Sequence, residues 1–186
     1  MNVEKQLEEI SAKLAKRVDT KSCFACGTCV AACPISRLTG PETYHPRRVV
    51  KATLEGEATG LLTEPTLWLC TSCHACLEHC PQKVPVSELI KDLQNLASSM
   101  GITPEDIVAE VENILATGWA LAPSEQANKK RSELGLPPIP IDNHGENDLQ
   151  KIAKATNLQE RLEKVKQRKA EEEQALSATE EGGGVS

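Results

Sequence analysis

The sequence has very few aromatic residues, only Phe24, Tyr44, Trp68 and Trp119 among 186. So little aromatic surface argues against a large core or an aromatic-lined binding pocket. No apolar run approaches the roughly 18 residues that a membrane-spanning helix needs. Charged residues throughout positions 1–20 also argue against a signal peptide. We therefore expect a cytoplasmic protein that is not inserted in a membrane.

Positive charge is also in deficit. Lys and Arg together number 21 against 27 Asp and Glu, which gives a formal net charge of −6 at pH 7. Nucleic-acid binding depends on clustered cations that neutralise phosphates, so this balance argues against a nucleic-acid partner. A chain of this length has room for one or two small domains and not for a large multidomain enzyme.

Cysteine is missing from most of the chain and concentrated in one part of it. All eight cysteines lie within residues 23–80, in two runs that both read C-x2-C-x2-C-x3-C-P. The first run holds Cys23, Cys26, Cys29 and Cys33, and the second holds Cys70, Cys73, Cys76 and Cys80. This spacing is typical of proteins that bind a pair of [4Fe–4S] clusters.

The spacing also predicts which cysteine serves which cluster. Three thiolates separated by two residues can wrap around one cubane, each meeting a different iron, and the fourth cysteine of each run ligates the other cluster in two-cluster ferredoxins. The predicted metal ligands of cluster one are therefore Cys23, Cys26, Cys29 and Cys80. Those of cluster two are Cys70, Cys73, Cys76 and Cys33.

Other uses of cysteine fit this pattern less well. Disulfides occur mainly in secreted proteins, and closely spaced C-x2-C triplets are poor disulfide geometry. Structural zinc usually takes two C-x2-C pairs far apart rather than three thiols in seven residues followed by Cys-Pro. With two clusters, eight thiolates satisfy eight irons, which leaves no open coordination site for a substrate. We therefore expect an electron relay without catalytic residues of its own.

Helical periodicity dominates the sequence, and no alternating strand pattern is evident, which predicts an all-α fold. We expect an N-terminal amphipathic helix in 1–20 and a domain with two [4Fe–4S] clusters in 21–100. A helical extension packing on that core follows in 101–140, and a charged extension with a flexible end in 141–186.

Local signals predict several helix limits. We expect one helix from Pro46 to Gly56 and another opened by Pro85, because proline suits a first turn and glycine an end. Thr63 and Thr103 are predicted to cap the helices that follow them. A short helix is expected from Ser124 to Leu134. A longer one is expected to carry an apolar stripe, Leu149, Ile152, Leu158, Leu162 and Val165.

The chain resembles α-helical ferredoxins, and over roughly residues 20–140 it is similar to the iron–sulfur C subunit of CoB–CoM heterodisulfide reductases from methanogens. Besides both cysteine runs, the similarity includes three segments. These are Leu38-Thr-Gly-Pro-Glu-Thr-Tyr-His-Pro-Arg-Arg-Val-Val50 between the runs, Trp68-Leu-Cys-Thr-Ser-Cys73 at the entry to the second run, and Leu134-Gly-Leu-Pro-Pro138.

The resemblance implies a non-catalytic subunit of an oxidoreductase that acts on a disulfide. In that family the C subunit passes electrons from a flavin-containing iron–sulfur subunit to a catalytic subunit, which reduces the CoM-S-S-CoB heterodisulfide in methanogenesis. A hydrogenase or another electron-donating module is the expected source of electrons. Two alternatives stay open: an iron–sulfur subunit of another oxidoreductase, of the fumarate or glycolate type or a sulfur-oxidising homologue, and a zinc-stapled scaffold.

Residues near the cysteines are candidates for tuning the clusters. His74 and His79, inside the second run, are candidates for donating hydrogen bonds or charge to cluster two, against the alternative that they are ordinary surface residues. A basic group lies between the runs, and we expect it to form surface salt bridges rather than a ligand site. The basic residues are His45, Arg47 and Arg48, and their candidate partners are Glu55, Glu57 and Glu64.

Overall fold

The computed structural model describes residues 20–121, 124–139 and 146–181, and within these ranges it contains helices and no strand. The predicted all-α fold is therefore confirmed for the described residues. The helix predicted over residues 1–20 lies almost entirely outside them. Contacts divide the chain into two compact units, residues 1–102 and residues 103–186. The finer division of residues 101–186 stays a prediction.

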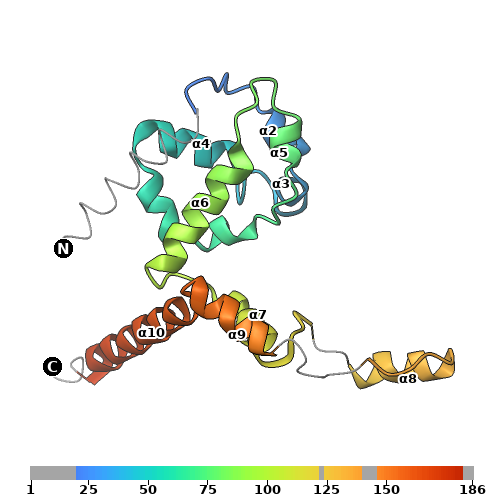
Figure 1. Cartoon of the computed structure of the whole chain (residues 1–186). Helices are drawn as coiled ribbons and strands as arrows, with labels where there is room; N and C mark the ends of the chain where they lie inside the picture. Colours follow the sequence, from blue (N-terminus) through green and yellow to red (C-terminus); the bar gives the residue numbers. More distant parts are fainter. Residues whose placement is uncertain (1–19, 122–123, 140–145, 182–186) are drawn as a thin grey trace. The chain divides into compact units, whose positions relative to one another are not determined.

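The first unit carries both cysteine runs and is built from short helices around one long one (Figure 1). The α-helices are α2 (Thr28–Ala32), α3 (Pro34–Thr39), α4 (Pro46–Glu55), α5 (Ala75–Glu78) and α6 (Val86–Ser99). Two 3₁₀ helices, η1 (Ala58–Thr63) and η2 (Pro65–Leu69), connect α4 to the second cysteine run.

The core of this unit forms on the apolar face of α6. Leu89, Ile90 and Leu93 recur at helical spacing and are completely or almost completely buried. Helix α4 and the 3₁₀ helix η1 contact α6 and add apolar side chains such as Val50 and Leu62 to the same cluster. Burying side chains of this kind stabilises the fold by about 1.5–3 kcal/mol each. Cys76 is one of the side chains of this hydrophobic core, so the core contains one of the predicted iron ligands.

Helix α4 has the limits that the sequence predicts. It begins at Pro46 and ends before Gly56, which adopts a left-handed φ of 78°. The N-cap was not predicted: His45 accepts the backbone N–H of Arg48 on its Nδ1 at 2.9 Å. The predicted Thr63 cap is wrong, because Thr63 closes η1 and Glu64 precedes η2 without a side-chain cap.

The second unit consists of α7 (Glu105–Thr117), α8 (Glu125–Glu133), α9 (Glu146–Ala155) and α10 (Leu158–Glu181). Helix α9 contacts both α7 and α10. Two ion pairs also join α10 to α7, at 2.6 Å and 2.8 Å. The pairs are Lys166–Glu112 and Lys169–Glu105. None of the helices in the described ranges is long and apolar enough to span a membrane.

Helix limits in this unit follow the sequence in part. The short helix expected from Ser124 to Leu134 is confirmed as α8, and Ser124, whose capping was not predicted, caps it by accepting the Ala127 N–H. Thr103 does not cap α7: Pro104 occupies the N-cap, and the Thr103 hydroxyl is buried without a partner. The predicted single long helix over residues 149–165 is also wrong. Asn157, with a left-handed φ of 56°, separates α9 from α10.

Candidate iron–sulfur site

The two cysteine runs fold in the same way. In each run the residues on either side of the second cysteine have a positive φ, which bends the chain around that cysteine. These residues are Ala25 (55°) and Gly27 (79°) in the first run, and Ser72 (54°) and His74 (60°) in the second. Three of the four are not glycine, and a left-handed conformation costs such residues free energy. The repeated geometry therefore indicates that a group common to both runs holds the loops.

The third and fourth cysteines are also placed alike. Cys29 and Cys76 are each the second residue of a short helix, and these helices, α2 and α5, contact each other (Figure 1). Each fourth cysteine accepts a backbone N–H from beyond its proline. Ser36 donates to Cys33 Sγ at 3.5 Å, and Val84 donates to Cys80 Sγ at 3.4 Å. Such N–H···S contacts stabilise negative charge on a ligand sulfur.

Four cysteines line a single surface pocket of about 370 Å³ that is open to solvent. They are Cys23, Cys26, Cys29 and Cys80. Three come from the first run and the fourth comes from the end of the second, so the fold brings together the set predicted for cluster one. Burial, and then the charges of neighbouring thiols, raise the pKa of Cys29. Coordination to iron offsets that cost, because a metal ion favours the thiolate.

Three cysteines of the other predicted set lie around Tyr44. Burial first, and then the thiol of Cys70, followed by Cys33 and Cys76, hold the pKa of the Tyr44 phenol well above its ordinary range. Burial and the charges of Cys70, Cys29 and Cys33 raise the pKa of Cys76 to about 11. The fourth member, Cys73, is exposed and lines a separate, more open depression together with Arg37 and His79.

Two buried hydroxyls beside this second set have no hydrogen-bond partner, Tyr44 Oη and Ser36 Oγ. Ser36 is the residue whose backbone N–H donates to Cys33 Sγ. Buried polar groups are nearly always hydrogen-bonded, so each orphan needs an explanation. A [4Fe–4S] cluster held by these cysteines would supply sulfur acceptors for such hydroxyls. The donor set and its surroundings therefore fit a [4Fe–4S] cluster.

The spacing of the thiols differs from that of a mononuclear site. In the described part of the chain, no three Cys, His, Asp or Glu side chains are close enough to hold one metal ion. Tetrahedral zinc with Zn–S bonds of 2.3 Å places its sulfurs about 3.8 Å apart. A cubane binds each thiolate on a different iron and so accommodates a wider spacing.

Two side chains next to the first set were not singled out as cluster-tuning groups from the sequence. The Thr28 hydroxyl lies 3.2 Å from Cys26 Sγ and, with the Thr28 backbone N–H, is the main cause of a lowered pKa at Cys26. Arg47 lines the same pocket as the four cysteines and lowers the pKa of Cys26 further. Both groups favour negative charge on the sulfur.

Three ring nitrogens of the two histidines in the second run have partners among the protein atoms. His74 Nδ1 lies 3.0 Å from Ser87 Oγ, and Lys91 Nζ lies 3.4 Å from His74 Nε2. Since a charged lysine can only donate, Nε2 is the acceptor and Nδ1–H donates to Ser87. His79 donates from Nδ1 to the Ala75 carbonyl at 2.9 Å. His74 thus joins the second run to α6, whereas His79 lines the same depression as Cys73. Tuning of cluster two by either histidine stays a prediction.

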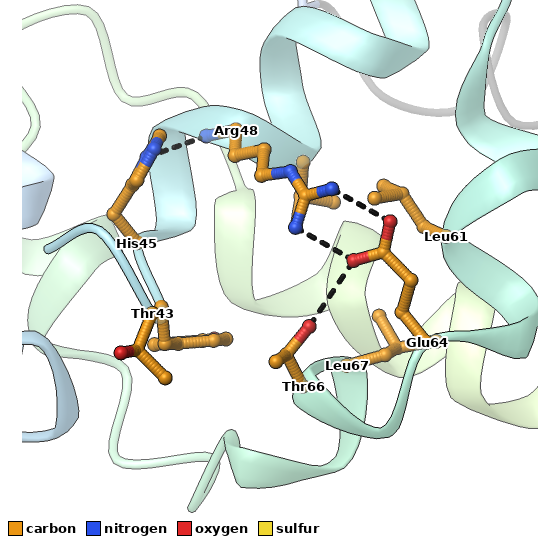
Figure 2. Close-up of a pocket in the computed structure, with 9 residues that line it drawn as sticks. Thr43, His45, Arg48, Leu61, Glu64, Thr66 and Leu67 are labelled. Atoms are coloured by element: carbon orange, nitrogen blue, oxygen red, sulfur yellow. Dashed lines mark hydrogen bonds and ion pairs between the residues drawn. The ribbon is translucent and has the colours of Figure 1, made fainter. Parts of the chain in front are cut away.

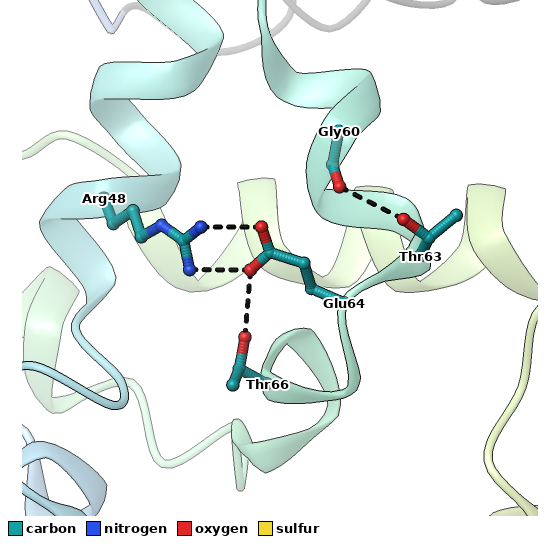
Figure 3. A network of polar contacts seen from close by, with 5 residues as sticks. All are labelled: Arg48, Gly60, Thr63, Glu64 and Thr66. Carbon is teal, nitrogen blue, oxygen red and sulfur yellow. Dashed lines mark hydrogen bonds and ion pairs between the residues drawn. The ribbon is translucent and has the colours of Figure 1, made fainter.

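The expected salt bridge of the basic group forms at Arg48 (Figure 2). Both terminal nitrogens of Arg48 donate to the carboxylate of Glu64 at 2.6 Å, and Thr66 Oγ1 donates to the same carboxylate at 3.2 Å (Figure 3). This contact joins α4 to the segment between η1 and η2. Arg48 therefore has a structural role, as predicted, whereas its neighbour Arg47 lines the cluster-one pocket.

Comparison with known proteins defines the class. Residues 19–84 match the model of a family described as a 4Fe-4S dicluster domain. Together with the eight cysteines, this match identifies an iron–sulfur protein, helical in the residues that the structure describes, that carries two [4Fe–4S] clusters and transfers electrons. It also decides against the zinc scaffold that the sequence left open.

Relatives define the family more narrowly. The chain is 39% identical over 126 residues to the C subunit of the ferredoxin:CoB-CoM heterodisulfide reductase of Methanosarcina mazei, an alignment that covers 68% of this chain and 76% of that protein. It is 30% identical over 161 residues to the C subunit of the H(2):CoB-CoM heterodisulfide,ferredoxin reductase of Methanothermobacter marburgensis, covering 84% and 85%. A protein of Archaeoglobus profundus, described as similar to the heterodisulfide reductase C subunit, is 29% identical over 164 residues, covering 84% and 85%. The chain belongs to the family of heterodisulfide reductase C subunits.

Proposed function

We propose that this chain relays single electrons through two adjacent clusters, from a flavin-bearing subunit to the catalytic subunit that reduces the CoM-S-S-CoB heterodisulfide. The observation that carries the proposal is the pocket lined by Cys23, Cys26, Cys29 and Cys80. Four thiolates from both runs in one place support crossed ligation, with Cys33, Cys70, Cys73 and Cys76 left for the second cluster. Every iron then has a protein ligand.

Closed coordination favours a relay over catalysis. A fully ligated [4Fe–4S] cluster exchanges one electron and has no vacant iron for a substrate. The residues of this chain accordingly hold the cubanes and set the polarity around them. The contact between α2 and α5, and the influence of Cys29 on the pKa of Cys76, support a short path from one thiolate set to the other. Reduction of one disulfide takes two electrons and two protons, so the relay acts twice in each turnover.

The partners and the substrate are proposed from the names of the relatives, several of which specify a CoB-CoM heterodisulfide and an electron donor such as ferredoxin or H(2). We infer a complex with a flavin-containing iron–sulfur subunit and with the catalytic subunit of heterodisulfide reductase. We place this complex in the cytoplasm, supplied with electrons by a hydrogenase or another donor module.

Reconstitution of the complex tests the relay. The anaerobically purified chain is expected to contain about eight irons and eight acid-labile sulfides, as two cubanes require. The flavin-containing and catalytic subunits, reduced through the flavin, should turn over the heterodisulfide when the cluster-loaded chain is added. They should not do so with the iron-depleted chain. Equal rates without the chain, or flavin and cysteine-rich partners absent from native preparations, would contradict the proposal.

A further inference from the structure

Tyr44 stands in an unusual position for a tyrosine. It precedes α4 in the segment between the two cysteine runs, and only 4% of its surface is exposed. Its hydroxyl makes no hydrogen bond of regular geometry with any atom of the described structure, the neighbouring Cys70 thiol included. A phenol is a strong donor, and leaving it buried and unpaired costs free energy.

Cysteine thiols that we assign to cluster two lie near enough to this hydroxyl to act on it. Three thiols act on it, those of Cys70, Cys33 and Cys76, and all three belong to the set proposed for cluster two. Cys33 comes from the first run and the other two come from the second, so the hydroxyl lies where the runs meet. With the cubane bound, the acceptors within its reach are thiolate and sulfide sulfurs. An ordinary phenol is protonated at neutral pH and donates to them.

We propose that Tyr44 is a positioning residue for cluster two that donates an O–H···S hydrogen bond to a sulfur of that cluster and raises its reduction potential. The inference rests on the ligand set proposed above. Reduction adds negative charge to the sulfurs, so a donor stabilises the reduced cluster more than the oxidised one, and hydrogen bonds to sulfur are a known determinant of potential. The buried setting strengthens the effect, because no water screens the contact.

The second orphan hydroxyl, Ser36 Oγ, lies beside Cys33, so the region around cluster two holds two donors without acceptors. Cluster one has a different environment: its side-chain donor, Thr28, approaches Cys26 at the exposed surface. Tyr44 is therefore a buried donor beside the second set, whereas Thr28 lies at the exposed surface beside the first.

The test exploits the fact that the chain contains a single tyrosine. Tyr44→Phe removes the hydroxyl and keeps the ring, and growth on 3-fluorotyrosine strengthens the donor at this position alone. Both clusters of the loaded protein are titrated potentiometrically with EPR detection. Tyr44→Phe should lower the reduction potential of cluster two. The expected size is a tenfold change in the equilibrium of electron exchange with cluster one, which corresponds to about 59 mV for a one-electron couple. Fluorination should shift it in the opposite direction.

Thr103→Val is the matched control, because it deletes a buried, unpartnered hydroxyl in the other unit and should leave both potentials unchanged. Pulsed EPR should also detect an exchangeable proton coupled to cluster two that Tyr44→Phe lacks. Unchanged potentials in the Phe and fluorotyrosine proteins, with full iron and sulfide content, would overturn the proposal. If Tyr44→Phe loses iron, the fluorotyrosine protein tests the proposal instead, and an unchanged cluster-two potential in that protein overturns it.

An error in the proposed assignment of ligands to the clusters would give a different result. If Tyr44→Phe shifts one cluster while Cys33→Ser disturbs the other, the tyrosine donates to a cluster, but the assignment of Cys33 is wrong.

Discussion

The two thiolate sets have the same local backbone and different surroundings. None of the four side chains Cys23, Cys26, Cys29 and Cys80 is fully buried. In the other set Cys33 and Cys76 are both buried, at 7% exposed each. Under the predicted ligation, identical cysteine spacing thus places one cluster near solvent and the other partly inside the core.

This difference indicates where the potentials are set. Burial disfavours the extra negative charge of a reduced cluster, and nearby donors or cations favour it. The exposed set has Arg47 and Thr28 beside it, and the buried set has Tyr44 and Ser36. The cysteine runs fix the geometry of ligation, whereas residues outside the pattern, several of them in the segment between the runs, make the two sites unequal.

Replacing the fourth cysteine of either run should have the largest effect on the difference between the two sites. Under crossed ligation Cys33→Ser should damage the cluster held mainly by the second run, and Cys80→Ser the one held by the first. Each variant should lose up to half of its iron, or show an altered EPR signal from one cluster while the other is unchanged. The paired variants control for each other. Damage confined to the cluster of the same run in each case would show that ligation is not crossed.

Removing the cation beside cluster one should have a smaller effect. Arg47→Gln should lower the potential of that cluster by roughly 30 mV, a threefold change in its one-electron equilibrium, and leave cluster two nearly unchanged. Because Arg47 is exposed, the shift should shrink as the salt concentration rises. Potentiometric titrations at two ionic strengths measure it.

Arg48→Gln is the control for charge in the same helix. It breaks the ion pair between Arg48, whose side chain is 47% exposed, and Glu64, whose side chain is 31% exposed. The expected cost is about 1 kcal/mol or less in stability, with no change in either potential. Equal potential shifts from both arginine variants would show that net charge, and not the place of Arg47 in the pocket, determines the effect.

The sequence predicts this molecule best where one residue type decides the local chemistry. Cysteine spacing identified the clusters, and Pro46 with Gly56 gave the limits of α4. The predicted threonine caps failed, because Thr63 closes the preceding 3₁₀ helix and the Thr103 side chain is buried without a partner. Propensity at one position does not reveal which way a side chain will pack.

The same limit explains what was missed around the clusters. The histidines inside the second run were the obvious tuning candidates by proximity in sequence, yet His74 binds Ser87 on α6. Tyr44 lies 11 positions from Cys33 and 26 from Cys70 in the chain and meets both only after folding. No local pattern carries that information, since it depends on how α4 and the runs pack.

The smallest shift in potential that we predict concerns Thr28, the donor beside the exposed set. Thr28→Val replaces the hydroxyl that lies 3.2 Å from Cys26 Sγ with a methyl group of similar size. Losing the O–H···S contact should lower the potential of cluster one by roughly 20 mV, about a twofold change, because water can replace a donor at the surface. Thr28→Ser keeps the hydroxyl and should restore the original value. A loss at Thr28 as large as that at Tyr44 would contradict the comparison, because burial would then not distinguish the two sites.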